Sequence, residues 1–288
     1  MAQRVAVRKT PKLFIGGAFT RSESGRTFAC EFDGHSVHAA RATRKDARDA
    51  VRAARTAWPA WRDRSAYNRG QIVYRLAEIM ESRRDQFAQA LRSSIATPTQ
   101  ADREVSAAID RIVWYAGWCD KIEQVLSTKN PVSTPHFNVS SPEATGVVAV
   151  VAPHAPSLLP LISTCVPIIC SGNTVVVVAS EKDPLSAVSL AEAIANADVP
   201  AGVVNVLTGY RAEIAPTLAA HMDVNAIDLW ISDEDLDAKT AELACDNLKR
   251  VRRRPEPLTD FWYGRDAQGL DWIQSFVEIK TVWHPAGL

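Results

Sequence analysis

The sequence predicts an α/β fold, in which helices cover both faces of a doubly wound parallel sheet. The first observation is that residues 146–181 read as a strand, a helix and a second strand. Residues 146–152 and 174–179 are short valine-rich runs, which are typical of strands buried on both faces. A break at residues 153–156 precedes an apolar helical stretch, which Gly172 ends. Such a unit commonly binds a dinucleotide at the carboxyl ends of its strands.

The second observation is that strands and helices keep alternating beyond this unit. Repeated βα units with apolar strands build one parallel sheet, so we expect the later strands beside the first two. Strands are predicted at 203–207 and 226–231, and helices at 185–196, 212–220 and 234–248.

A helical layer is expected before the sheet. Residues 1–11 are basic and predict a loose segment, and residues 12–20 predict two short strands that turn at Gly16 and Gly17. Pro59 is expected to interrupt the first helix. Apolar residues at three- and four-residue spacing predict helices at 46–57, 66–91 and 100–125.

Two elements are expected to protrude. Residues 127–145 are polar and contain three prolines, which favours a β-hairpin outside the core. Residues 275–283, near the C-terminus, alternate apolar and polar side chains with a period of two. This pattern predicts an exposed strand that needs a sheet edge to join.

The composition excludes several classes of protein. The 288 residues are 47% hydrophobic, and 33 basic side chains balance 33 acidic ones, so no net field favours nucleic acid or an acidic membrane. The apolar runs are shorter than the roughly 20 residues that span a bilayer, and the N-terminus lacks a signal-peptide core. The five cysteines have no metal-binding spacing, and their odd number argues against a disulfide framework. We therefore expect a cytoplasmic protein that binds neither nucleic acid nor membrane.

The basic run at 249–254 is the strongest local charge feature. We interpret it as a solvated loop or a frayed edge strand, followed by a linker at Pro255 and Pro257. A nucleic-acid patch is the alternative, but no aromatic platform accompanies the charges.

Several stretches in order resemble the aldehyde dehydrogenase superfamily, over nearly the whole chain. The matching residues are 14–17, 53–61, 75–81, 146–153, 201–209 and 276–283. The resemblance implies that residues 1–254 form the family's cofactor-type domain, with a hairpin at 127–145. It implies that residues 255–288 are a linker and the family's C-terminal oligomerisation strand.

The catalytic machinery of the family has no counterpart. Only 18 residues separate Cys245 from Gly264, where an active member carries its catalytic domain, and neither the nucleophilic-cysteine motif nor Glu-Leu-Gly-Gly occurs. A thiol nucleophile also needs an oxyanion hole and a base. Cys165 and Cys170 lie in an apolar helix, so structural roles are favoured for all three cysteines.

The cofactor contacts of the family are also replaced. Ala155 stands where an asparagine helps to hold the oxyanion, so no catalytic residue is assigned. Val178 replaces a ribose-binding lysine, and Ile231 replaces a glycine that admits the pyrophosphate to a helix N-terminus. The second glycine of a Gly-x-Gly turn is Arg211, and acids follow at 233–235. Acids suit a helix N-terminus and would repel a pyrophosphate.

We therefore expect no cofactor. Three residues keep a vestigial cofactor-binding character, and weak NAD binding through them is the alternative: Glu181, Gly209 and Ser232. His35 and His38 form a solvated loop pair rather than a metal site, because no third ligand is near. His154, which replaces a family tryptophan, is interpreted as packed or solvated.

The combined pattern predicts a non-catalytic aldehyde-dehydrogenase-like subunit, a homo-oligomer or a partner of an active full-length member. It resembles the short, inactive second copy of family-sixteen aldehyde dehydrogenases. The alternative is a degenerate NAD(P)-dependent enzyme that oxidises an aldehyde to an acid. Strand addition needs no catalytic centre. The expected oligomerisation residues are Phe137, Val139, Val277, Ile279, Thr281 and Trp283.

Overall fold

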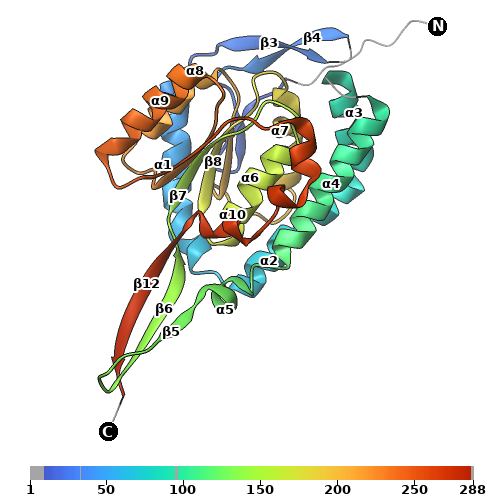
Figure 1. The fold of residues 1–288 in the computed structure, drawn as a ribbon. Coiled ribbons are helices and arrows are strands. Elements are labelled where there is room, and N and C mark those ends of the chain that lie inside the picture. The colour runs from blue at the N-terminus through green and yellow to red at the C-terminus, as the bar shows by residue number, and fades with distance from the viewer. Residues whose placement is uncertain (1–9, 33, 95–96, 287–288) are drawn as a thin grey trace, which may run out of the picture.

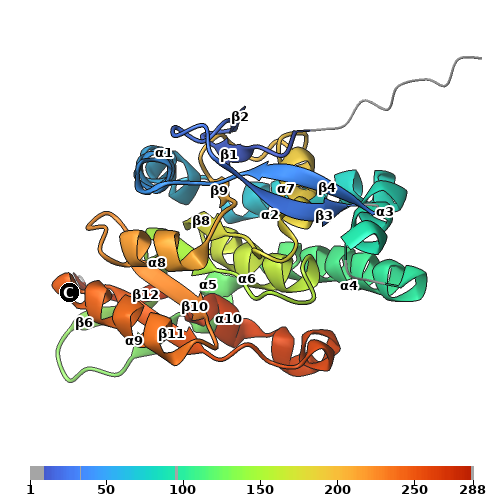
Figure 2. The ribbon, with the colours of Figure 1, turned by 90° about the horizontal axis from the view of Figure 1, so that it is seen from above.

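A seven-stranded sheet runs through the molecule in the order β11-β10-β7-β8-β9-β1-β2 (Figures 1 and 2). The computed structural model describes residues 10–32, 34–94 and 97–286, so nearly all of the segment predicted to be loose, 1–11, lies outside it. The predicted α/β fold with a parallel sheet is confirmed. The parallel strands are β7 (Val147–Val151), β8 (Thr174–Val178), β9 (Val204–Leu207), β10 (Ala226–Trp230) and β11 (Arg250–Arg254).

The central strand β7 shows why both faces of the sheet are apolar. Val148 and Val150 point into one large hydrophobic cluster, and Val147 and Val151 point into a second cluster on the opposite face. The first cluster is formed with α2 (Ala66–Ser82), α3 (Arg84–Ser94), α4 (Pro98–Ala116), α6 (Leu159–Cys170) and α7 (Pro184–Ile194). The second is formed with α1 (Arg44–Arg62), α8 (Arg211–Ala219) and α9 (Glu234–Leu243).

The N-terminal strands extend the sheet as predicted. β1 (Leu13–Ile15) and β2 (Ala18–Thr20) pair antiparallel across a turn in which Gly16 and Gly17 have positive φ angles of 60° and 80°. β1 also pairs antiparallel with β9. A separate two-stranded sheet, β3 (Thr27–Phe32) with β4 (His35–Ala40), was not predicted.

The predicted interruption of the first helix at Pro59 is wrong. α1 continues to Arg62 because tertiary packing holds its last turn: Trp61 is buried, and its indole Nε1 donates to the carbonyl of Ile169 at 3.0 Å. The loss of one backbone donor at Pro59 is offset by this contact.

Two longer helices predicted at 66–91 and 100–125 are each divided. The first breaks at Arg83, where a turn separates α2 from α3 and the guanidinium reaches Glu192 on α7 at 2.9 Å. The second ends at Ala116 with Gly117 as its C-cap, and α5 (Ile122–Leu126) follows. Apolar periodicity continues through both turns, so it does not reveal them.

The basic run was interpreted as a solvated loop or a frayed edge strand, and the edge strand is confirmed: Arg250–Arg254 form β11 at the edge of the seven-stranded sheet. The strand is not frayed, because it pairs with β10 along its whole length, from Ala226↔Arg250 to Trp230↔Arg254. The guanidinium groups of Arg252 and Arg254 lie over the Trp272 ring at 5.0 and 4.8 Å, so their stems cover apolar surface. The helix predicted at 234–248 stops at Leu243, before a 3₁₀ turn.

The segment after β11 is short but well packed. Two 3₁₀ turns (Thr259–Tyr263 and Arg265–Ala267) and α10 (Leu270–Gln274) bring Trp262 and Trp272 against Trp230, with ring centroids 5.0 and 5.6 Å away from it. All three rings belong to the larger hydrophobic cluster. The domain boundary expected at 254/255 stays a prediction.

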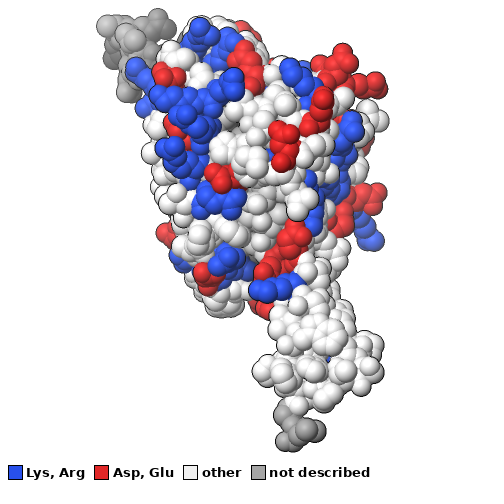
Figure 3. All heavy atoms as spheres, turned by 90° about the vertical axis from the view of Figure 1, so that its left-hand side faces the viewer, with Lys and Arg blue, Asp and Glu red and all other residues white. Residues whose placement is uncertain are grey.

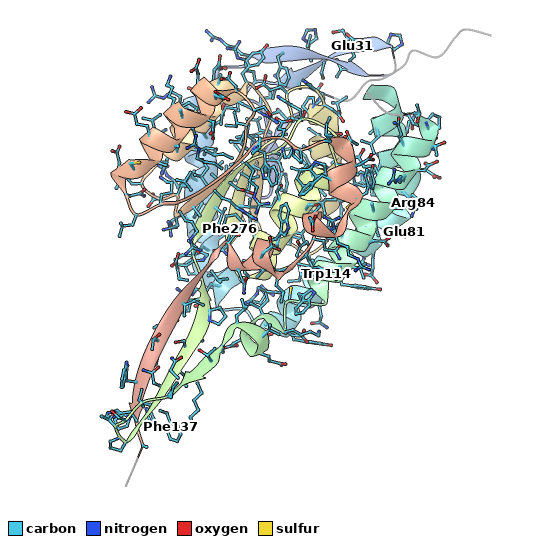
Figure 4. All side chains as sticks on the ribbon, viewed as in Figure 1. Glu31, Glu81, Arg84, Trp114, Phe137 and Phe276 are labelled. Carbon is cyan, nitrogen blue, oxygen red and sulfur yellow. The ribbon has the colours of Figure 1, made fainter. Side chains whose placement is uncertain are left out.

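A second sheet protrudes from this body (Figure 1). This protruding sheet has the order β12-β6-β5 and consists of β5 (Thr128–Asn130), β6 (His136–Ala144) and β12 (Val277–Pro285). β12 pairs antiparallel with β6 along its full length, so the C-terminal strand joins the edge of its own hairpin. Phe276 lies where the chain leaves the core, and Phe137 lies near the tip (Figure 4).

Candidate functional site

The strand order defines one crevice at which a ligand would be expected. From β7 the chain passes through β8 to β9 on one side, and then returns to β10 and β11 on the other side. In open α/β sheets, ligands bind outside the carboxyl ends of the strands where this direction reverses. The candidate site is therefore the switch crevice, formed by the residues that follow β7 and β10.

The side chain of Arg211 fills the switch crevice. Arg211 is the first residue of α8, and only 3% of it is exposed. Its guanidinium donates to the carbonyl of Ala152, just after β7, and to the carbonyl of Trp230, the last residue of β10, at 3.4 Å. A positively charged group of the chain itself thus bridges the two strand ends.

Glu256, which lies just after β11, binds the guanidinium of Arg211. Its Oε1 accepts from Arg211 Nη1 at 2.5 Å, and its Oε2 accepts from the backbone N–H of His154 at 2.9 Å. Its own N–H donates to Ser232 Oγ at 3.2 Å. The loops after β7, β10 and β11 are therefore joined through Glu256, by its carboxylate and its backbone N–H.

Burial lowers the pKa of Arg211, and the hydrogen bond to Glu256 opposes that shift. The Nε of Arg211 is buried and has no hydrogen-bond partner in the described part of the chain, so the guanidinium depends on its remaining contacts. A buried charge that loses its partner typically costs about 3–5 kcal/mol of stability.

His154 is half-buried beside this ion pair. Its Nδ1 lies 3.4 Å from Ser180 Oγ, and its Nε2 lies 3.9 Å from Glu256 Oε1. Burial, followed by the charge of Arg211, lowers the pKa of His154 to about 4. The ring is therefore neutral at pH 7 and adds no charge to the crevice.

The three residues predicted to be vestigial cofactor contacts lie around the same crevice. Glu181 accepts from the backbone N–H of Arg211 at 2.6 Å and so caps α8. Gly209 has a φ of 142°, and a side chain there would approach the backbone N of Ala42 at 3.1 Å. Ser232 binds Glu256, as described above. Their role toward a cofactor stays a prediction.

The replaced positions lie in apolar surroundings or at the surface. Val178 and Ile231 are buried in the hydrophobic cluster around α1 and α8, and Ala155 is exposed. At the start of α9, Asp233 Oδ1 accepts from the backbone N–H of Leu236 at 3.0 Å. This helix N-terminus is thus capped by a side chain of its own.

Comparison with known proteins matches this architecture to one family. The family model described as "Aldehyde dehydrogenase family" matches residues 28–252. Cytosolic aldehyde dehydrogenase 1 of Elephantulus edwardii is 33% identical over 254 residues, which cover 83% of this chain and 49% of that protein. PnpE from Pseudomonas sp. WBC-3 is 29% identical, with a TM-score of 0.80, and the match covers 84% of this chain and 50% of PnpE.

The chain belongs to the aldehyde dehydrogenase family. Cytosolic 10-formyltetrahydrofolate dehydrogenase of Pongo abelii, 30% identical, is a further relative, matched over 85% of this chain and 28% of its own length. The chain thus spans about half the length of the aldehyde dehydrogenases that it matches, or less.

Neither Cys30 nor Cys165 of this family member sits in an activating environment like that of a nucleophile. Burial raises the pKa of Cys30 to about 11 and that of Cys165 to about 12, so both thiols stay protonated at neutral pH. Cys245 is exposed, and its Sγ donates to the carbonyl of Ala241 at 3.4 Å within the turn after α9.

The remaining predicted positions lie away from the crevice. His35 and His38 are both on β4, and within 10–32, 34–94 and 97–286 no three histidine, cysteine or acidic side chains are placed to hold a metal ion. Within the same residues, no helix has the length and apolar character to cross a bilayer.

The predicted oligomerisation residues divide into two groups. On the protruding sheet, Phe137, Ile279 and Trp283 are 48%, 57% and 57% exposed, and Val139 is also exposed. Thr281 is exposed and bonds Ser140 Oγ at 2.8 Å, whereas Val277 is buried at the base of the sheet.

Sequence reasoning missed Arg211 and Glu256 as a pair. The sequence identifies Arg211 only as the replacement of a family glycine, and Glu256 falls within the predicted linker. A usable signal was present, because an arginine at the turn of a βα unit has to find an acidic partner once it is buried.

Proposed function

We propose that this family member is a non-catalytic subunit, which assembles through the protruding sheet with a full-length active aldehyde dehydrogenase or with a second copy of itself. In this proposal it is a counterpart of the inactive second copy found in family-sixteen enzymes. It resides in the cytoplasm, where cysteines are reduced unless an oxidant reaches them. It binds no NAD.

The observation that carries the proposal is the Arg211–Glu256 pair in the switch crevice. A pyrophosphate that entered here would have to displace the Glu256 carboxylate from Arg211 or lie beside it. Displacement leaves the Glu256 carboxylate, which is only 17% exposed, without its partner, and coexistence places like charges together. Either route makes the free energy of cofactor binding less favourable than it is in a site without this ion pair.

The protruding sheet supports the assembly part of the proposal. Within the described residues, β12 has β6 on one side and no strand on its other side. Exposed backbone donors and acceptors along a nine-residue strand, with Ile279, Val282 and Trp283 beside them, favour pairing with another chain. The distal part of the sheet is almost free of charged side chains on the face in Figure 3.

A full-length partner is favoured over a second copy. In the family that the chain resembles, the C-terminal strand reaches the catalytic-domain sheet of a neighbouring subunit. Here residues 255–276 fold back onto the Trp230 side of the sheet, so one copy offers no such sheet to the other between β11 and β12. A full-length member offers one.

Co-expression with a full-length aldehyde dehydrogenase, followed by size-exclusion chromatography with light scattering, tests the proposal. We expect one peak that contains both chains, and the dehydrogenase activity should stay with that peak. Two separate peaks, each with the mass of its own oligomer, would contradict the heteromeric assembly.

A further inference from the structure

Two cysteines far apart in sequence meet beneath the base of the protruding sheet. Cys119 lies in the turn between α4 and α5, and Cys170 is the last residue of α6. Both thiols donate to one acceptor, the carbonyl of Tyr115, with sulfur–oxygen distances of 3.7 and 3.5 Å. The side chain of Cys119 also interacts with that of Cys170 directly, so the two sulfurs are neighbours.

The surrounding packing holds this pair in place. Both residues are buried in the same hydrophobic cluster. Gly70 of α2 packs against Cys119, and a Cβ added there would lie 3.4 Å from the Cys119 Cβ. Arg69 Nε donates to the carbonyl of Cys170 at 3.3 Å, which fixes the end of α6.

One of the two cysteines lines a cavity. Cys119 is 2% exposed and lines a polar cavity of about 510 Å³, together with Arg62, Arg69 and Glu143. This volume exceeds what a small polar molecule needs. Cys170 is fully buried and does not line this cavity. Burial, with a contribution from Cys119, raises the pKa of the Cys170 thiol above the ordinary range.

We propose that Cys119 and Cys170 form an oxidisable dithiol, which a peroxide entering this cavity converts to a disulfide. Cys119 first releases its thiol proton, and the thiolate attacks one peroxide oxygen. The O–O bond breaks, a sulfenic acid forms, and the departing hydroxide takes up the released proton and leaves as water. The Cys170 sulfur then attacks the sulfenic sulfur. The S–S bond forms, the S–O bond breaks, and the hydroxyl leaves as water with the Cys170 proton. Two thiols lose two electrons, and hydrogen peroxide gains them.

The bridge would tie the end of α4 to the end of α6, directly under the strands that leave the core. The same cavity is lined by Ala144, at the end of β6, and by Val277, at the start of β12. Oxidation would therefore stiffen the base of the protruding sheet. Closing a loop between residues 119 and 170 also restricts the unfolded chain.

Thiol counting on the Cys245→Ser protein tests the proposal, because this change removes the one exposed cysteine. The folded protein is treated with hydrogen peroxide, quenched with catalase, denatured and alkylated. We expect four alkylated thiols before treatment and two after it, with a mass loss of two hydrogens. Dithiothreitol should restore four. The unfolding midpoint should rise on oxidation and fall again on reduction.

Trypsin locates the bridge, since Cys119 lies in peptide 112–121 and both Cys165 and Cys170 lie in peptide 130–182. In the same background, Cys165→Ser is the matched control and should keep the bridge, because its sulfur contacts the Thr164 hydroxyl at 4.0 Å. Cys119→Ser and Cys170→Ser should each abolish it, with alanine variants as a second pair if either serine variant misfolds. Four alkylated thiols after peroxide, or a bridge that survives Cys170→Ser, would overturn the proposal.

Discussion

The guanidinium of Arg211 donates hydrogen bonds to the ends of two adjacent strands, β7 and β10, and is held there by Glu256. The sequence alone predicted that Ala155, Val178 and Ile231 had lost their family roles, because each replaced residue type is visible in its motif. It could not predict what fills the space instead. Glu256 lies 45 residues after Arg211, and only the tertiary fold brings the two together.

A buried carboxyl on β10 gives a prediction at the same scale. Asp228 Oδ2 accepts from Trp230 Nε1 at 2.9 Å, and its Oδ1 has no hydrogen-bond partner among the residues that the structure describes. Burial raises the pKa of Asp228 to about 7 from 3.8. Between these two values the folded protein binds the extra proton, so this group makes the free energy of unfolding fall as the pH rises.

Asp228→Asn should remove this dependence. The free energy of unfolding of both proteins is measured by urea unfolding at pH 4.5 and pH 8. The native protein should lose about 3 kcal/mol relative to the variant when the pH is raised from 4.5 to 8, at about 1.4 kcal/mol per pKa unit. The lowered pKa of His154 makes the free energy of unfolding rise with pH between about pH 4 and 6.5. This effect is the same in both proteins, so it cancels in the comparison. A stability difference that does not change with pH would contradict the role given to Asp228.

At the scale of elements, valine-rich runs predicted the parallel strands well, because only a strand covered on both faces has that composition. Helix ends and the basic strand β11 were predicted less well. Arg83 and Gly117 follow the ends of helices whose apolar patterns continue beyond them. In β11, Arg254 packs over the rings of Trp230 and Trp272, which lie far away in sequence. Neither cause can be seen within a short window of sequence.

The free edge of β12 gives a prediction at this scale. Ile279→Lys should weaken assembly strongly, because a lysine on an edge strand opposes pairing with a further strand. Ile279 is largely exposed in the single chain, so the unfolding midpoint should stay nearly unchanged. Sedimentation velocity of the chain mixed with a full-length dehydrogenase measures the loss.

Tyr67→Lys is the matched control for Ile279→Lys. Tyr67 on α2 is 66% exposed and lies outside the protruding sheet. It should leave the assembly intact. An Ile279→Lys protein that assembles as well as the Tyr67→Lys control would argue against β12 as the interface.

The whole molecule combines a retained framework with a crevice that is filled from within. The order of βα units and the two protruding elements could be predicted from the sequence, since apolar strands and an exposed period of two are local signals. The Arg211–Glu256 pair can form because the loops after β7, β10 and β11 meet at the switch point. This meeting depends on the complete sheet and cannot be seen in a local stretch of sequence. Under the proposed function, both features together favour a subunit of an assembly over a degenerate enzyme.

Calorimetric titration of NAD into the purified chain, combined with an assay for NADH formed from an aldehyde, tests this account most directly. We expect no saturable heat up to about 1 mM NAD, a concentration that corresponds to only about 4 kcal/mol of binding free energy, and no NADH. A one-site isotherm in the micromolar range, together with aldehyde-dependent NADH production, would contradict the account.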